Sequence, residues 1–164
     1  MSNLKTLVIG HTEEEYHHAL RKYFDVVFII SETQNADINW HDLANLNVPL
    51  KSPSSSSLND STFLNILKKY QRFTDINQRR YIGVNEHEGE VFNSFTLTYY
   101  WAYKLLQDKA IEIIIMQNFP HEGFDYIFYL IAKELGIRVI ATHQLSVIGN
   151  RFWICEDIDE FGSF

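Results

Sequence analysis

The chain has very little cysteine. Cys155 is the only one among 164 residues, so no internal disulfide bond is possible, and a reducing compartment fits this usage. The N-terminal sequence MSNLKTLVIGHTEEE lacks the long apolar stretch of a signal peptide. No run of the sequence approaches the ~20 apolar residues that a membrane-spanning helix needs. We therefore expect a cytoplasmic protein without a transmembrane segment.

Basic residues are also scarce. The chain has 14 Lys and Arg against 21 Asp and Glu, which gives a formal net charge of −7. A nucleic-acid-binding surface needs clustered cations that displace counterions. The only local concentration comprises Lys68, Lys69, Arg72, Arg79 and Arg80, which is more typical of a solvated helix face. We expect no nucleic-acid partner.

Several well-known functional motifs are missing. The stretch VIGHTEEE after the first apolar run does not match the dinucleotide fingerprint GxGxxG. The sequence contains neither the phosphate loop GxxxxGK[ST] nor the nucleophile elbow GxSxG. It also lacks the HxH and HExxH spacings that hold metals. The sequence therefore predicts neither a cofactor nor a metal site.

The overall composition is that of an ordinary globular domain. Apolar residues make up 46% of the chain and charged residues 21%, and the length allows a sizeable core. Aromatic residues reach 15%, which favours a core filled with large rings over a sugar-binding surface. We expect residues 1–164 to form a single α/β domain in which the Ser-rich segment 51–60 is a flexible loop.

Alternating apolar patterns predict two βαβ units. The first combines a strand at 6–10, a helix at 13–24 and a strand at 25–30. In its helix, Tyr16, Leu20, Tyr23 and Phe24 share the apolar spacing. The second unit combines a strand at 110–118, a helix at 123–136 that ends at Gly136, and a strand at 137–144.

Two further helices are predicted between these units, at 62–73 and 91–109. The stretch 35–50 is compatible with a short strand or a turn of helix, and 152–157 with a last short strand. Strands that alternate with helices indicate a three-layer, Rossmann-like α/β domain with a mostly parallel sheet.

Ligands of an open parallel sheet bind beyond the carboxyl ends of its strands. Three segments fall there by position: Gly10-His11-Thr12, Asn118 to Gly123, and Thr142-His143-Gln144. We expect these segments to be loops, each of which carries a histidine directly after a strand. We therefore predict a ligand site at this edge of the sheet, with His11, Thr12, Asn118, His143 and Gln144 among its binding residues.

His121 and Glu122 are the predicted catalytic pair. A neutral imidazole can act as a base near physiological pH, and a carboxylate beside a helix N-terminus stays ionised. The alternative is structural: Glu122 and Asp125 are the polar start of a helix, and Pro120 fixes the turn before it. Both interpretations remain open at the level of sequence.

The segments IIIMQNFPHEGFDYIFYLIAKELGIRVI and NRFWICEDIDEFG resemble the N-terminal region of bacterial capsular polysaccharide biosynthesis proteins of the glycosyltransferase type. The similarity covers mainly Ile111 to Gly162. It implies a glycosyltransferase of two facing Rossmann-like halves, of which this chain would be the first and would be inactive alone. That half binds the sugar acceptor, and the missing C-terminal half binds the nucleotide-sugar donor.

Carried over to this sequence, the resemblance places Asn118, Pro120, His121 and Glu122 in the interdomain cleft, with His143 and Arg151 on neighbouring loops. His121 would be the general base that deprotonates an acceptor hydroxyl. Arg151 would bind a phosphate or an acidic sugar.

Two other hypotheses for the function of this chain remain open. One is a non-catalytic α/β module that binds a ligand or a protein. The other is a small hydrolase or nucleotide-processing enzyme that uses His11 and His121. The sequence predicts no oligomeric state and does not identify the donor or the acceptor sugar.

Overall fold

The computed structural model describes residues 4–10, 13–48, 61–78, 88–121, 123–144 and 152–156. For residues 73–78, 88–91, 143–144 and 152–153 it describes the backbone alone. The predicted loop at 51–60 lies outside these ranges.

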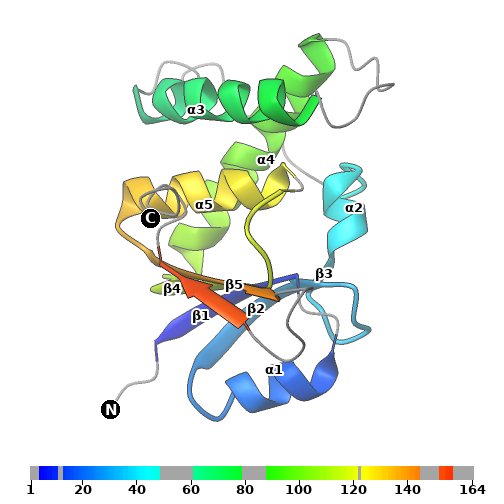
Figure 1. Ribbon diagram of the computed structural model, residues 1–164, viewed down its shortest axis with the longest axis vertical. Helices are drawn as coiled ribbons and strands as arrows, with labels where there is room; N and C mark the ends of the chain where they lie inside the picture. Colours follow the sequence, from blue (N-terminus) through cyan, green and yellow to red (C-terminus); the bar gives the residue numbers. More distant parts are fainter. Residues whose placement is uncertain are drawn as a thin grey trace.

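One mixed sheet organises the described residues (Figure 1). Its order is β3-β2-β1-β4-β5-β6, and its strands are β1 (Lys5–Ile9), β2 (Asp25–Ser31), β3 (Ile38–Asn39), β4 (Ile113–Met116), β5 (Arg138–Gln144) and β6 (Phe152–Cys155). All neighbouring strands are parallel except β5 and β6, which are antiparallel. This confirms the α/β class and the mostly parallel sheet, and the layout is consistent with a Rossmann-like one.

β1 lies between β2 and β4, with Ile9 paired to Ile30 on one side and to Met116 on the other. The chain builds β2 and β3 outward on one side of β1, then returns to add β4, β5 and β6 on the other side. The strand order therefore reverses between β1 and β4. Such a reversal opens a crevice at the carboxyl ends of the two strands.

Helices cover both faces of the sheet (Figure 1). α1 (Glu14–Leu20) lies on one face, and α4 (Glu88–Asp108) and α5 (Phe124–Leu135) lie on the other. α2 (Trp40–Ala44) stands beside this second group. α3 (Ser61–Gln78) packs on the side of α5 that faces away from the sheet, and α4 runs from the level of α3 past α5 toward the sheet, so α3 adds a layer to the three that the sequence predicted.

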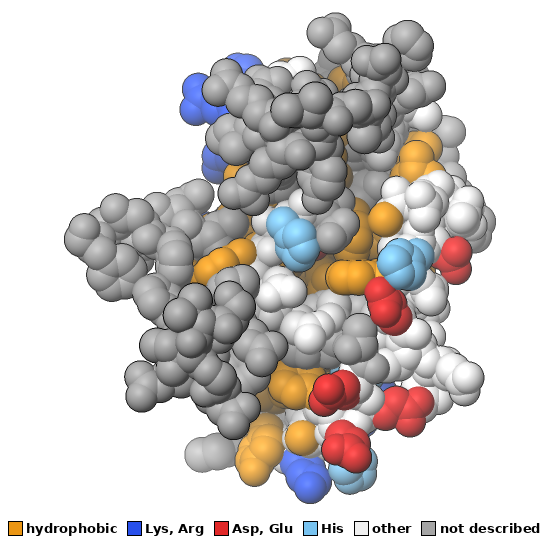
Figure 2. Space-filling model, turned by 45° about the vertical axis from the view of Figure 1, so that its right-hand side comes forward, with side chains coloured by type: hydrophobic (Ala, Val, Ile, Leu, Met, Phe, Trp, Pro, Cys, Tyr) orange, Lys and Arg blue, Asp and Glu red, His pale blue; other side chains and the backbone are white. Residues whose placement is uncertain are grey.

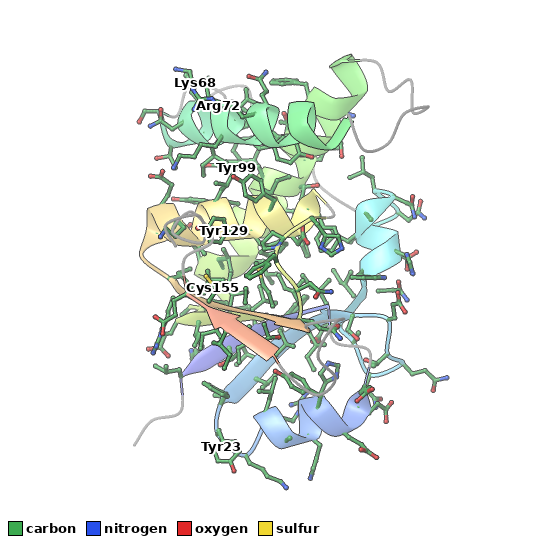
Figure 3. The ribbon with its side chains drawn as sticks, in the orientation of Figure 1. Tyr23, Lys68, Arg72, Tyr99, Tyr129 and Cys155 are labelled. Atoms are coloured by element: carbon green, nitrogen blue, oxygen red, sulfur yellow. The ribbon has the colours of Figure 1, made fainter. Side chains whose placement is uncertain are left out.

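The core is divided by the sheet into a large and a small cluster. Alternate residues of β1 point to opposite faces, so Leu7 and Ile9 enter the large cluster under α4 and α5, and Val8 enters the small one that α1 covers. Many of the aromatic residues fill the large cluster. Figure 3 shows Tyr99 between α3 and α5, and Tyr99 is 1% exposed. The prediction that the rings fill a core is confirmed for these residues.

Three predicted features differ from the structure. The helix predicted at 13–24 ends at Leu20, because a turn follows in which the Tyr23 N–H donates to the Leu20 carbonyl at 2.9 Å. Tyr23 was assigned to the apolar spacing of this helix, but it is 74% exposed. α3 and α4 are both longer than their predicted ranges of 62–73 and 91–109.

The outward face of α3 carries basic residues, as predicted. Figure 3 shows Lys68 and Arg72 pointing away from the rest of the molecule, and both are exposed. Arg79 and Arg80 lie outside the described residues. In the part of the chain that the structure describes, no helix combines the length and the apolar character needed to cross a membrane.

Candidate functional site

The predicted convergence of strand ends is confirmed for the backbone. β1, β4 and β5 are adjacent and parallel, so their carboxyl ends meet at one edge of the sheet. The Gln117 N–H donates to the Ile9 carbonyl at 3.0 Å, and the Thr142 hydroxyl donates to the Gln117 carbonyl at 3.0 Å. These bonds hold Gln117, the first residue after β4, against the ends of β1 and β5.

A small cleft opens at this edge, where the strand order reverses. We call it the edge cleft, and its lining comprises Ile9, Gly10, Trp40, Met116, Gln117, Asn118, His121, Phe124 and Asp125. Its enclosed volume is about 20 Å³, which is room for about one water molecule. Figure 2 turns this side of the molecule forward and shows histidine side chains next to apolar ones.

Glycine is required at two positions around the edge cleft. Gly10 has a φ of +88°, which brings the end of β1 close to the indole of Trp40 and the side chain of Gln117. Gly123 has a φ of +84° and precedes α5, and a Cβ there would lie 3.1 Å from the Tyr70 hydroxyl oxygen. Residues with a side chain rarely adopt such angles. The glycines therefore allow the tight turns that form the walls of the cleft.

His121 lies at the mouth of the cleft, on the turn between β4 and α5. Its side chain is 47% exposed, whereas the side chain of Asp125 is only 10% exposed. The Asp125 Oδ2 accepts a hydrogen bond from the His121 backbone N–H at 2.9 Å and lies 3.8 Å from the ring Nδ1. The histidine is therefore paired with a nearly buried carboxylate from the first turn of α5.

The other predicted site residues have different outcomes. Asn118 lines the edge cleft together with His121. The sequence assigned His143 and Gln144 both to a strand at 137–144 and to a binding loop at its end. The strand is confirmed and the loop is not, because β5 continues through both residues and pairs them with Trp153 and Phe152 of β6. His11, Thr12, Glu122 and Arg151 lie outside the described residues, so their roles stay predictions.

Several residues of the cleft were absent from the predicted site, among them Trp40, Gln117 and Asp125. Trp40 comes from the stretch that the sequence left open between strand and helix, so no signal could assign it. Gln117 directly follows β4, and a wider view of the strand end would have included it. Asp125 lies four residues after His121, a spacing that brings two residues together across a helical turn.

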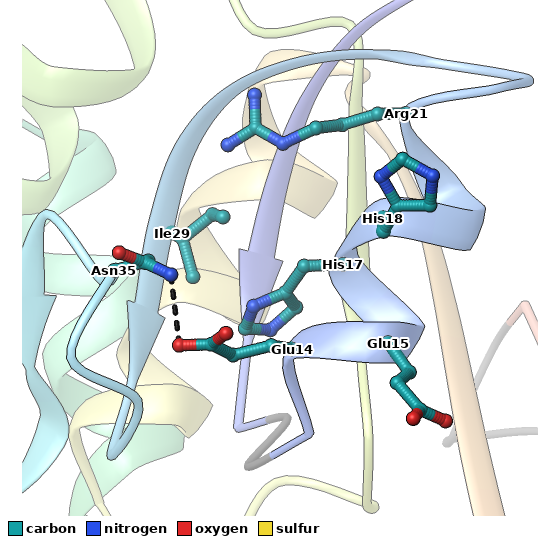
Figure 4. Close-up of a pocket in the computed structure, with 7 residues that line it drawn as sticks. All are labelled: Glu14, Glu15, His17, His18, Arg21, Ile29 and Asn35. Atoms are coloured by element: carbon teal, nitrogen blue, oxygen red, sulfur yellow. Dashed lines mark hydrogen bonds between the residues drawn. The ribbon is translucent and has the colours of Figure 1, made fainter.

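A larger groove lies between α1 and the end of β2 (Figure 4). Its volume is about 500 Å³, and its lining comprises Glu14, Glu15, His17, His18, Arg21, Ile29 and Asn35. The Asn35 amide donates to Glu14 Oε1 across the groove at 2.8 Å. His17 is buried and His18 is exposed, which confirms that they face different sides of the helix. The smaller edge cleft is the candidate ligand site because the sheet topology, and not only surface shape, creates it.

Metal binding gains no support here, since the described residues contain no group of three or more His, Cys, Asp or Glu side chains that could hold an ion. Comparisons of the chain with protein-family models, with curated proteins and with solved structures find no significant match. The geometry of the edge cleft is therefore the basis for any functional conclusion.

Proposed function

We propose that this chain is the Rossmann-like, acceptor-side domain of a glycosyltransferase-like protein that builds a bacterial capsular or surface polysaccharide. The observation that carries the proposal is the position of His121. Its imidazole and the Asp125 carboxylate lie in the crevice where β1 and β4 end side by side. In open parallel sheets this is the place where ligands bind.

The chemistry of the cleft fits an acceptor sugar. The amides of Gln117 and Asn118 can each donate and accept hydrogen bonds, as sugar hydroxyls do. Trp40 adds an apolar ring surface to the same cleft. His121 would take the proton from the acceptor hydroxyl as that oxygen attacks the donor sugar. Glu122 would assist the histidine, and Arg151 would bind an acidic group of the acceptor.

The nucleotide-sugar donor would come from a facing C-terminal domain, so the domain alone would not catalyse transfer. This division explains how the cleft can be so small. An enclosed volume of about 20 Å³ surrounds only part of a bound sugar, and a facing domain would supply the other wall.

The proposal is tested by following backbone amide NMR signals during titration with a panel of neutral hexoses, acidic hexoses and free nucleotides. We expect sugars, and not nucleotides, to shift the signals of Gly10, Gln117, Asn118 and His121. His121→Ala should raise the dissociation constant obtained from these shifts at least about tenfold, the size expected for one lost hydrogen bond to a charged or polar group. His18→Ala is the matched control, because it removes an exposed histidine from the other groove and should change nothing at the cleft.

Shifts confined to the groove beside α1, or shifts with nucleotides alone, would contradict the proposal. The second pattern would favour a nucleotide-processing enzyme that uses His11 and His121.

A non-catalytic α/β binding module is the second candidate, and the small volume of the edge cleft favours it. The two candidates are distinguished by the activity of the protein that the whole gene encodes. In a glycosyltransferase, His121→Ala should reduce sugar transfer by at least about 100-fold, the usual contribution of a general base. In a binding module, sugars or peptides would bind without any turnover.

A further inference from the structure

The hydrogen bond of the His121 ring fixes its tautomer. Nδ1 lies 2.8 Å from the carbonyl oxygen of Phe119. A carbonyl oxygen can only accept a hydrogen bond, so the proton of the neutral ring must be on Nδ1. Nε2 is then the basic nitrogen of the ring.

The turn that places this carbonyl is closed by Asp125. One carboxylate oxygen, Oδ2, accepts from the His121 backbone N–H at 2.9 Å. The other, Oδ1, accepts from the Tyr126 N–H at 2.7 Å. The carboxylate thus joins the backbone of His121 to the first turn of α5. Its Oδ2 lies 3.8 Å from the ring Nδ1, a distance of ion pairs that is longer than a hydrogen bond.

We infer that Asp125 is a positioning residue that holds His121 in the Nδ1–H tautomer, so that Nε2 is presented as the base of the site. The role of Nε2 as a base rests on the proposed function, but the tautomer of the ring can be measured without it. If the ring accepts a proton from an acceptor hydroxyl, the nearby carboxylate also stabilises the positive charge that forms.

A simpler role must be separated from this one. A carboxylate in the first turn of a helix stabilises the helix through its dipole, whatever lies before it. In that case Asp125→Ala would lower stability without changing the ring of His121. Stability measurements alone do not distinguish the two roles, but the tautomer does.

The experiment uses the whole chain with ¹⁵N-labelled histidine. Long-range ¹H–¹⁵N spectra, recorded at a pH where the ring is neutral, identify the protonated ring nitrogen. The wild-type ring should show the Nδ1–H form. Asp125→Asn keeps an oxygen that accepts from the His121 N–H, so this variant should keep the same form. Asp125→Ala removes the acceptor and should shift the ring toward the Nε2–H form.

An Nε2–H ring in the wild type would overturn the inference without any variant, so the test stands even if Asp125→Ala does not fold. Retention of the Nδ1–H form in a folded Asp125→Ala protein, or its loss in Asp125→Asn, would also overturn it. No sugar enters the measurement. A failed sugar titration with the expected tautomer would therefore reject the proposed function and leave the role of Asp125 intact.

Discussion

Gly123 lies in the turn before α5, between His121 and the first turn of the helix. Its φ of +84° and ψ of −61° lie in a region that residues with a Cβ rarely enter. The residue separates the exposed His121 from the buried first turn of the helix. A change here should therefore disturb the site and the helix start together.

We predict that Gly123→Ala lowers the free energy of unfolding by about 1–3 kcal/mol, the range for a strained backbone position. The added Cβ would also lie 3.1 Å from the Tyr70 hydroxyl oxygen. Gly136→Ala is the matched control, because Gly136 has a φ of +68° but a Cβ there meets nothing within 4 Å. Urea denaturation of both variants checks the prediction, and an equal or larger loss in Gly136→Ala would contradict it.

The residues of the site differ in how far the sequence could predict them. Asn118 and His121 follow a strongly apolar run, and a strand end in a parallel sheet points to ligand binding. Trp40 reaches the cleft from α2, which follows the edge strand β3, and no local sequence pattern contains this contact. The pairing of His121 with Asp125 depends on how tightly the turn folds, which Gly123 determines.

At the scale of elements, the apolar spacing predicted α3 as a helix but not its position in the fold. Aromatic packing determines that position. Phe63 is 1% exposed, and its ring centroid lies 5.1 Å from that of Tyr99 and 5.4 Å from that of Phe95, both on α4. The next residue, Leu64, is 45% exposed on the outer face. Substitutions of these two neighbouring residues therefore compare the inner face of α3 with its outer face.

We expect Phe63→Ala to lower the free energy of unfolding by about 3–5 kcal/mol, because it leaves a cavity among the rings. Leu64→Ala should cost about 0.5 kcal/mol, as is usual for exposed positions. Thermal and urea denaturation of the two variants give the comparison. Similar losses in both would mean that α3 does not dock on α4 and α5 as a part of the core.

The period of the apolar residues predicted the type of most elements but not where each one ends. α1 stops at Leu20 because the backbone turns there, although the apolar spacing continues to Tyr23 and Phe24. β6 was predicted as a strand from its composition. Its antiparallel pairing depends on the path of the chain after β5, which composition does not encode.

At the scale of the whole molecule, the alternation of strands and helices predicted a mostly parallel sheet, and this is confirmed. The order of the strands did not follow from the sequence. Once β1 and β2 pair, β4 can add beside either of them, and the choice depends on which side α4 and α5 cover. The position of the site depends on that choice, because the cleft exists only where β1 and β4 are neighbours.

This order also predicts how stability is distributed. β1 and β4 each have a strand on both sides, and their central residues are buried. β6 has one described neighbour, β5, and Ile154 on it is 72% exposed. Hydrogen exchange followed by NMR should therefore show amides of Val8 and Ile115 opening only with global unfolding.

The amides of β6 should exchange at least about 100-fold faster than those of β1 and β4 after correction for intrinsic rates, because an edge strand opens locally at lower cost. Amides of α3 near Phe63 serve as the internal control for cooperativity. If they exchange with β1, the outer helix layer and the sheet form one unit. Protection in β6 equal to that in β1 would contradict the central position of the β1–β4 pair, and with it the reason for placing the site there.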